Sequence, residues 1–415
     1  MHRTPDPQAP SAASHRAFAR PGSESAIVRT AFVSTYPPRR CGIATFTSDL
    51  RRAVGGGSVV ALDGTVDVQA YGPEVQHRIA VGVDAPPAWG RTASRVSRSV
   101  DVVSVQHEYG IWGEDDGAGV LDFVDGLGVP AVATLHTVLR TPTPRQRRIL
   151  TDLVRAASAT VVMSRAAAGL LTSAYGIDPS RVDVIPHGVP DLPMVSADSV
   201  KPTVGLEGRR VLLSFGLLGP GKGYELAIEA LPGVVARHPD AVYVIVGATH
   251  PDLVRREGER YRQGLAARAE ALGVSAHVRF VDRFVGRSEL TRWLESADVF
   301  VTPYPNLDQI VSGTLSYAMG AGRAIVSTPY AYAAELLADG RGLLVAPGSP
   351  TALAGALADL LADDDARGRM GRRAYAHSRR MVWDEVGAAY RAVFDRVAGY
   401  PRVLPATVGA VAAGV

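Results

Sequence analysis

Short apolar segments alternate with longer helix-like segments along most of this 415-residue chain. The short segments are rich in Val, Ile and Ala, and each is followed by small or polar residues. Strands separated by helical segments are typical of parallel sheets whose right-handed crossover connections place helices on both faces. The alternation therefore predicts an α/β fold that is built from doubly wound parallel sheets.

The alternation falls into two series that are separated by residues 191–209 (DLPMVSADSVKPTVGLEGR), a segment without periodicity. This segment is rich in Pro, Ser and Gly, which predicts an interdomain linker in which Lys201 has no evident role. The chain is also longer than one hydrophobic core supports. We predict a disordered tail over residues 1–26, a first domain over 27–195, a linker over 196–209, a second domain over 210–375, a returning helix over 376–398 and a tail over 399–415.

The predicted strands of the first series cover residues 30–35, 59–62, 66–71, 78–81, 101–105, 131–135, 160–163 and 182–185. Those of the second series cover residues 211–215, 241–246, 278–281, 299–302, 324–327 and 343–345. Helices are expected between the second set of strands, at about residues 224–237, 261–272, 288–296, 315–320, 332–337 and 350–361. A final helix over about 364–397 is expected to break before Trp383 and to pack on the first domain.

Composition excludes several classes of function. A content of 47% hydrophobic and 20% charged residues is typical of a soluble globular protein, and the net charge of +3 is too small to indicate nucleic-acid binding. A single cysteine, Cys41, excludes an internal disulfide and fits a reducing compartment. No apolar run approaches the roughly 18 residues of a membrane span, and residues 1–26 lack the apolar core of a signal peptide. We expect a cytoplasmic protein.

Residues 302–329 (TPYPNLDQIVSGTLSYAMGAGRAIVSTP) place a polar loop between a strand and a helix. The loop ends in Ser312, Gly313 and Thr314, and the predicted helix follows directly. Unpaired backbone N–H groups at the positive end of a helix dipole suit a phosphate. An ordinary Ser/Thr helix cap is the alternative interpretation.

A second loop of this kind follows the strand at 30–35, where YPPRRCGIATF places Gly42 just before a helix that starts at about Ala44. Glycine at this position would let the backbone approach a ligand. The alternative is a simple strand-to-helix turn. Cys41 is interpreted as a small loop residue without a chemical role.

Three histidines also follow predicted strands. His107, with Glu108 beside it, follows residues 101–105, while His136 follows 131–135 and His187 follows 182–185. In open parallel sheets, ligands bind outside the carboxyl ends of the strands. Each histidine alone has a surface position as its alternative, but together they indicate a shared site.

Lysine is scarce in this chain. Of its 44 basic residues only Lys201 and Lys222 are lysines, and Lys222 lies in the glycine-rich turn GPGKG. A lysine retained against an arginine background indicates a position that needs a compact ammonium group, where a planar guanidinium would not fit.

Six segments resemble, in order and spacing, the retaining GT-B glycosyltransferases of the family 4 type (glycosyl transferases group 1). The resemblance covers about residues 28–397 and implies two Rossmann-like domains that face each other across a cleft. It also implies transfer of a hexose from a nucleotide sugar (UDP- or GDP-hexose) to a hydroxyl acceptor. The segments are RRCGIATF (39–46), VIPHGV (184–189), SFGLLGPGKGYELAIEAL (214–231), YVIVG (243–247), SADVFVTPY (296–304) and AMGAGRAIVSTP (318–329).

The resemblance assigns roles to single residues. Lys222 matches the lysine that binds the donor phosphate, His136 matches the histidine that holds the donor sugar, and Gly42 matches a glycine-rich loop at the diphosphate. Gly216 belongs to the same motif as Lys222. We expect the acceptor and sugar contacts to come from His107, Glu108 and His187, and further phosphate contacts to come from Ser312, Gly313 and Thr314. No metal motif is seen, so neither a metal nor another cofactor is expected.

The chain also departs from the family pattern. Leu217 stands where the family usually has an arginine, and the family's paired glutamates fall on Gln309 and Tyr317. Gln309 can still bond sugar hydroxyls and is expected in the catalytic site, and Tyr317 is expected at the donor. No carboxylate matches a nucleophile, which favours front-face transfer. The departures leave two alternatives open, a sugar 1-phosphate-dependent transferase or phosphorylase and a non-catalytic sugar- or nucleotide-binding protein.

Overall fold

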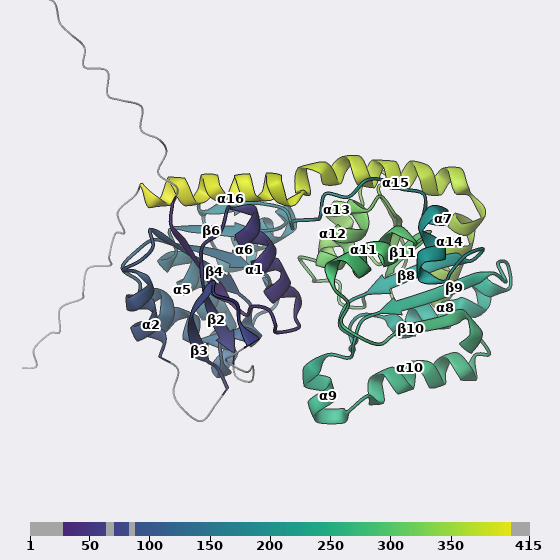
Figure 1. Ribbon diagram of the computed structural model, residues 1–415, viewed down its shortest axis with the longest axis horizontal. Coiled ribbons are helices and arrows are strands. Elements are labelled where there is room, and N and C mark those ends of the chain that lie inside the picture. Colours follow the sequence, from purple (N-terminus) through teal and green to yellow (C-terminus); the bar gives the residue numbers. More distant parts are fainter. Residues whose placement is uncertain (1–27, 64–69, 83–87, 400–415) are drawn as a thin grey trace, which may run out of the picture.

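The computed structural model describes residues 28–63, 70–82 and 88–399, which form two parallel sheets surrounded by helices (Figure 1). One sheet is built from the first half of the chain and the other from the second half. Both sheets lie under a pair of helices, α15 and α16, that run along one side of the molecule. The α/β class and the doubly wound arrangement are as predicted. The strand predicted at 66–71 lies largely outside the described residues.

The first sheet has the strand order β3-β2-β1-β4-β5-β6-β7, with every pairing parallel. Its strands are β1 (Thr30–Ser34), β2 (Ser58–Asp63), β3 (Val75–Ala80), β4 (Val102–His107), β5 (Ala131–Leu135), β6 (Ala159–Val162) and β7 (Val182–Val184). The helices of this region are α1 (Gly42–Ala53), α2 (Trp89–Val96), α3 (Glu114–Gly117), α4 (Gly119–Asp125), α5 (Pro144–Ala156) and α6 (Arg165–Tyr175). Short 3-10 turns cover Tyr109–Ile111 and Pro179–Arg181.

The second sheet has the order β10-β9-β8-β11-β12-β13 and is also parallel. Its strands are β8 (Arg210–Phe215), β9 (Ala241–Val246), β10 (Val278–Val281), β11 (Val299–Thr302), β12 (Ala324–Ser327) and β13 (Leu343–Leu344). Its helices are α8 (Tyr224–Val235), α9 (Pro251–Glu257), α10 (Arg260–Ala271), α11 (Arg287–Glu295), α12 (Gly313–Gly320), α13 (Ala331–Leu336), α14 (Pro350–Ala362) and α15 (Asp364–Ser378). A 3-10 turn covers Ser275–His277.

The central strands are apolar throughout because both faces of each sheet are covered. In β9 every residue is buried, and its side chains alternate between two separate hydrophobic clusters, with Val242 and Val244 in one and Tyr243 and Ile245 in the other. In β1, Val33 and Phe32 divide between two clusters in the same way. This pattern explains why the strands read as continuous apolar runs and not as alternating ones.

Each sheet has one point at which the strand order reverses, between β1 and β4 in the first and between β8 and β11 in the second. The helices that leave these neighbouring strands go to opposite faces of the sheet, which opens a crevice at the carboxyl ends. The predicted loops that contain Gly42, His107, Lys222 and Ser312 follow or end these four strands, whereas His136 and His187 follow β5 and β7. The topology therefore places one half of the candidate site at each reversal.

The C-terminal helix is interrupted where the sequence predicts. Helix α15 is followed by a 3-10 turn (Arg379–Met381), and α16 (Trp383–Ala398) begins after Val382, whose backbone is extended with φ −61° and ψ 148°. Figure 1 shows α15 over the second domain and α16 over the first. Trp383 and Phe394 belong to a core cluster of the first domain, and the Tyr390 hydroxyl lies 3.1 Å from Thr134 Oγ1. The C-terminal pair of helices α15 and α16 thus packs on both domains.

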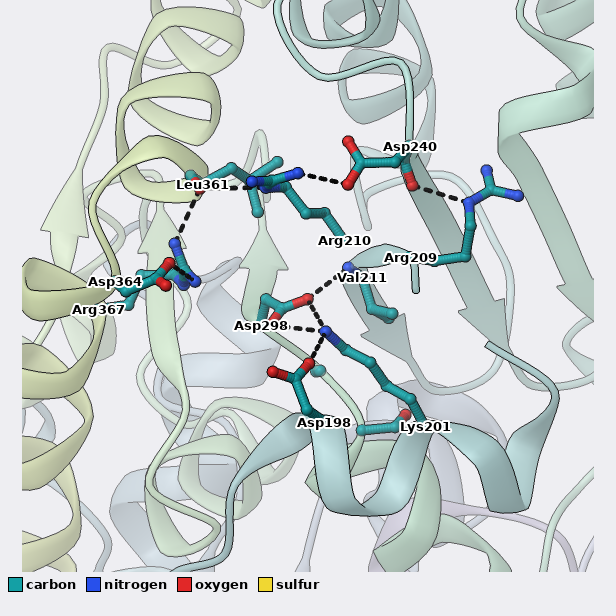
Figure 2. Close-up of polar contacts among 12 residues, drawn as sticks. Asp198, Lys201, Arg209, Arg210, Val211, Asp240, Asp298, Leu361, Asp364 and Arg367 are labelled. Carbon is teal, nitrogen blue, oxygen red and sulfur yellow. Dashed lines mark hydrogen bonds and ion pairs between the residues drawn. The ribbon is translucent and has the colours of Figure 1, made fainter. Parts of the chain in front are cut away.

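The predicted linker is more ordered than its composition indicates. It contains the helical turn α7 (Ala197–Val200) and a 3-10 turn (Lys201–Val204). The Lys201 side chain is 6% exposed, and its Nζ lies 2.6 Å from Asp198 Oδ1 and 2.9 Å from Asp298 Oδ2. Figure 2 shows the lysine between these two carboxylates. Asp298 Oδ2 also accepts a hydrogen bond from Val211 N at 2.7 Å. The interpretation of Lys201 as a residue without a role was wrong, because it ties this segment to the start of β8.

No helix among the described residues combines the length and the apolar character needed to cross a membrane.

Candidate active site

The glycine-rich turn after β8 packs against the loop after β11. Gly216 has φ +132°, and a Cβ added to it would lie 3.5 Å from Thr314 Cγ2. Gly223 has φ +71°, and its added Cβ would lie 2.0 Å from the carbonyl oxygen of Pro303. A side chain at position 223 would therefore push apart the two loops that follow the reversal point.

Lys222 lies within this turn, over the ring of Tyr304. Its Nζ is 4.6 Å from the ring centroid, and it forms no ion pair with any residue that the structure describes. Tyr304 is held from two sides, because its ring stacks on Tyr330 at 5.1 Å and its hydroxyl lies 2.9 Å from Thr314 Oγ1. An ammonium group that is fixed by a ring face and is free of carboxylates is available to an anionic ligand.

Helix α12 begins beside this lysine, and Ser312 is its cap. Ser312 Oγ accepts a hydrogen bond from Leu315 N at 3.3 Å and lies 3.1 Å from Thr314 Oγ1. The helix-cap interpretation is therefore confirmed for Ser312, which is 4% exposed, and its phosphate contact stays a prediction. Gly313 and Thr314 remain at the helix N-terminus, where the first N–H groups have no partner within the helix.

His136 follows β5 at the edge of the first sheet. Its Nε2 lies 2.9 Å from Gln106 Oε1, and its ring stands edge-on to Phe46 with 4.9 Å between centroids. Burial lowers the pKa of His136 to about 3, with further lowering by the nearby His187 and His107. His136 is therefore neutral at physiological pH and acts as a hydrogen-bonding group without charge.

His187 brings the two halves of the site together. Its Nδ1 lies 2.8 Å from the carbonyl oxygen of Gly188, and its ring lies 5.1 Å from that of Phe46. A Cβ added to Gly313 would lie 2.8 Å from His187 Nε2, so His187 contacts the first turn of α12. Burial lowers its pKa to about 4.

His107 is buried at the end of β4. Strand β4 continues through His107, and the side chain is 0% exposed with no described partner for either ring nitrogen. Burial lowers its pKa to about 4. The strand is longer than predicted, which buries His107, and its contact with an acceptor stays a prediction. Glu108 is partly exposed, its Oε2 is buried without a described partner, and burial raises its pKa.

The loop after β1 is ordered by Cys41. The thiol accepts a hydrogen bond from Ala44 N at 3.3 Å and lies 3.2 Å from Thr35 Oγ1, so Cys41 caps α1. Gly42 is the first residue of this helix, and an added Cβ would meet no atom within 4 Å. Packing within the chain therefore does not require glycine here, and the space in front of it is open.

Tyr317 and Gln309 both have partners within the protein. Gln309 Nε2 donates to the carbonyl oxygen of Val311 at 2.8 Å. The Tyr317 hydroxyl donates to Asp49 Oδ2 of the first domain at 3.2 Å, and Arg287 forms an ion pair with the same carboxylate. Burial raises the pKa of Asp49, and Arg287 opposes that rise. The hydroxyl of Tyr317 is therefore directed to the other domain in this structure.

Further polar contacts hold the loop after β11 against the first domain. Arg140 Nε lies 2.8 Å from Asp308 Oδ1, and Ser164 Oγ donates to the carbonyl oxygen of Ile310 at 2.9 Å. The carboxylate of Glu335 accepts hydrogen bonds from the backbone N–H groups of Arg165 and Ala166, at the start of α6. The two domains are thus joined around the candidate site.

Sequence reasoning missed Tyr304, Gln106 and Asp49. Tyr304 lies in the quoted stretch SADVFVTPY, directly after a predicted strand, which was a usable signal. Gln106 was interpreted as a loop residue because the strand was ended at Val105. Asp49 lies inside a helix, where nothing in the sequence marks a partner 238 residues away.

Two further features bear on the choice of site. Among the described residues, no group of three His, Cys, Asp or Glu side chains is arranged to hold a metal ion. A cavity of about 660 Å³, lined among others by Arg29, Gly56, Ser58 and Arg391, lies at the amino ends of the first sheet's strands. It contains none of the predicted site residues, and ligands of such sheets bind at the opposite edge.

Both halves of the chain match known families. A family model described as glycosyltransferase family 4 matches residues 58–191, and one described as glycosyl transferases group 1 matches residues 198–377. The solved structure of HepE from Anabaena in complex with UDP has a TM-score of 0.73 and 16% identity, covering 89% of this chain and 100% of that one.

Curated relatives carry inositol phosphate glycosyltransferase names. The D-inositol 3-phosphate glycosyltransferase of Streptomyces scabiei is 29% identical over 294 residues, which are 64% of this chain. The protein of the same name from Xylanimonas cellulosilytica is 33% identical over 290 residues, again 64% of this chain. The alignments span 63% and 66% of the length of these relatives.

Proposed function

Because the chain belongs to the GT-B-fold glycosyltransferases of the family 4 type, we propose that it transfers a hexose from a nucleoside diphosphate sugar to a hydroxyl acceptor, with retention of anomeric configuration. The donor binds the second domain and the acceptor approaches from the first. The reversal points of the two sheets supply the residues of the two halves.

The observation that carries the proposal is the position of Lys222. Its ammonium group lies over Tyr304, forms no ion pair with a described residue, and is linked through Tyr304 and Thr314 to the N-terminus of α12. The leaving diphosphate gains negative charge as the glycosidic bond breaks. An ammonium group and a helix N-terminus that are already in place stabilise that charge without reorganisation, which is the larger part of many catalytic effects.

The sugar is proposed to lie between His136 and Gln309. A neutral His136 bonds a hydroxyl group without repelling or attracting the diphosphate. Gln309, which replaces a family carboxylate, carries no charge and offers its amide to sugar hydroxyls. In the bound state its hydrogen bond to Val311 is then shared with or exchanged for one to the sugar.

Retention is proposed to occur by front-face transfer. Asp49 is held by Arg287 and Tyr317, and burial raises the pKa of Glu108, so neither is placed as a free, ionised nucleophile. The bond from the anomeric carbon to the diphosphate breaks, and the acceptor oxygen bonds to the same face of that carbon. The acceptor's proton passes to the departing phosphate oxygen. The chemistry uses Lys222 in place of a metal ion.

UDP-hexoses are the first donors to test, since the HepE structures hold UDP, UDP with glucose, or UDP-glucose. The purified chain is incubated with UDP- and GDP-hexoses and with inositol 3-phosphate as acceptor, in the presence and absence of EDTA. We expect release of one nucleoside diphosphate, unaffected by EDTA, and a product whose anomeric proton shows the donor's configuration by NMR. An inverted product contradicts front-face transfer, and loss of activity in EDTA contradicts the metal-free reaction.

A sugar 1-phosphate-dependent transferase or phosphorylase is the second candidate. It is favoured by Leu217, which supplies no charge, and by Tyr317, whose hydroxyl is bonded to Asp49. Both stand where the family contacts the nucleoside diphosphate. Adding glucose 1-phosphate and mannose 1-phosphate to the donors of this panel decides between the two, because a phosphorylase is active with one of these and is indifferent to every nucleotide sugar.

A further inference from the structure

Gln106 is held firmly at the carboxyl end of β4. Its side chain is fully buried, and its amide group is bonded on both sides, with Nε2 donating to Ser104 Oγ at 3.2 Å and Oε1 at 2.9 Å from His136 Nε2. Its backbone carbonyl accepts a hydrogen bond from Trp112 Nε1 at 2.8 Å. In this orientation of the amide, its oxygen faces the imidazole of His136.

This contact determines where the proton of His136 lies. An amide oxygen only accepts hydrogen bonds, so the ring nitrogen that faces it must be the donor. His136 then carries its proton on Nε2, and Nδ1 keeps its lone pair. Nδ1 has no partner among the described residues, and the ring is partly exposed, so this lone pair is open to a ligand.

We propose that Gln106 is a positioning residue that fixes His136 as the Nε2–H tautomer and thereby presents Nδ1 as an acceptor to a hydroxyl group of the transferred sugar. The inference rests on the proposed function and adds the direction of the hydrogen bond, in which the sugar donates and the protein accepts. The opposite tautomer carries its proton on Nδ1, and an imidazolium carries one there as well. Either form would offer the sugar a donor at Nδ1 in place of an acceptor.

The surroundings keep His136 in the neutral form that this role needs. The titratable groups that act on it are His107 from β4 and His187 from the segment after β7, and both have pKa values lowered to about 4 by burial. Phe46 covers another side of the ring. The three rings therefore stay neutral near pH 7, and among the described residues Gln106 is the side chain that is hydrogen-bonded to His136.

The tautomer is measured directly by two-bond ¹H–¹⁵N NMR on protein labelled with ¹⁵N-histidine, with His136→Gln used to assign the signals. We expect the Nδ1 of His136 to show the shift of an unprotonated nitrogen at pH 7. An unprotonated Nε2 overturns the proposal. This measurement needs no substrate, so its outcome does not depend on whether the protein is an active transferase.

Gln106→Glu provides the second test. A carboxylate beside Nε2 is expected to raise the pKa of His136 by about one to three units, the usual effect of an opposite charge at this distance. The acid limb of the pH profile of kcat/KM should move upward with it. Gln76→Glu makes the same change at an exposed position on β3 and should leave both the His136 signals and the profile unchanged. An unchanged His136 pKa in Gln106→Glu contradicts the assigned contact.

Discussion

The two lysines of this chain occupy opposite environments. Lys201 is almost completely buried and is paired with two carboxylates, Asp198 and Asp298, at the start of the second domain. Lys222 is partly exposed, stands over the ring of Tyr304 and has no carboxylate partner in the described part of the chain. Both positions use a compact ammonium group, but the charge of Lys201 is compensated by carboxylates and that of Lys222 has no carboxylate partner among the described residues.

The difference shows what a scarce residue type does and does not indicate. Lysine against an arginine background marked two positions where the shape of the cation matters. It did not tell structural positions from functional ones. That distinction came from the partners, since a paired buried charge stabilises an arrangement, whereas an unpaired charge at the carboxyl edge of a sheet is a binding group.

Removal of the buried lysine should have the largest effect. Lys201→Met leaves Asp298, whose side chain is 9% exposed, without its cation, and breaking such a pair costs about 3–5 kcal/mol of unfolding free energy. Urea unfolding measures the loss, and turnover of the folded enzyme should be unchanged. Lys201→Met combined with Asp298→Asn removes the uncompensated charge and should recover part of the stability. Equal stability of Lys201→Met and the wild type would refute the structural role.

Lys222→Ala should show the reverse pattern. Turnover is expected to fall by about 100-fold or more, the scale for the loss of one electrostatic stabiliser of a leaving group. The unfolding free energy should change by only about 0.5–1 kcal/mol, the value of an exposed cation–π contact. Steady-state kinetics and urea unfolding on the same preparations separate the two effects. Lys222→Arg should also be impaired, and full activity in that variant would refute the need for a compact ammonium.

The buried histidines should make stability depend on pH in a way that neither lysine does. Burial lowers the pKa of His107 to about 4, below its unfolded value of about 6.5, so the unfolded state binds more protons. The stability due to this group is present above about pH 6.5 and is lost as the pH falls toward 4. Asp49 and Glu108, whose pKa values are raised, act in the opposite direction.

His107→Phe tests this sign. The slope of unfolding free energy against pH between 6 and 5 should decrease by about 1 kcal/mol per pH unit. Asp198→Ala, which changes an exposed carboxylate, should leave the slope in this pH range intact. A slope in His107→Phe equal to that of the wild type would show that His107 is not neutral in the folded protein.

The smallest effect is expected at the exposed partner of Lys201. The Asp198 side chain is 83% exposed, and exposed ion pairs contribute about 0–1 kcal/mol. Asp198→Ala should therefore lower the unfolding free energy by less than 1 kcal/mol, measured by urea unfolding, and leave turnover unchanged. A loss as large as that in Lys201→Met would show that Asp198, and not Asp298, is the important partner.

Much of the fold could be predicted from the sequence because parallel strands that are covered on both faces read as apolar runs. Most strands were located to within two residues, and the break before Trp383 was foreseen. The end of β4 was misplaced because Gln106 and His107 are polar but buried, which composition cannot show. The turn that holds Lys201 was missed because a four-residue helix has no periodicity, and Asp298 lies 97 residues away.

The candidate site was predicted in part. Lys222, Gly216 and His136 were identified from motifs; the first two follow β8 at a reversal point, and His136 follows β5, which neighbours β4. The contacts that link the halves were not foreseen, since Asp49, Arg287 and Tyr317 meet only after both domains have folded. Local sequence patterns describe single turns and carry no signal for such pairings.

The most direct test of the central claim is a thermal-shift measurement with UDP, GDP, ADP and inorganic phosphate on the wild type and on Lys222→Ala. A ligand at 100-fold its dissociation constant stabilises the fold by about 2.7 kcal/mol, which is readily seen. We predict a clear shift with one nucleoside diphosphate in the wild type and a much smaller one in Lys222→Ala at the same concentration. Equal shifts in the two proteins would contradict the assignment of Lys222 to the donor phosphate.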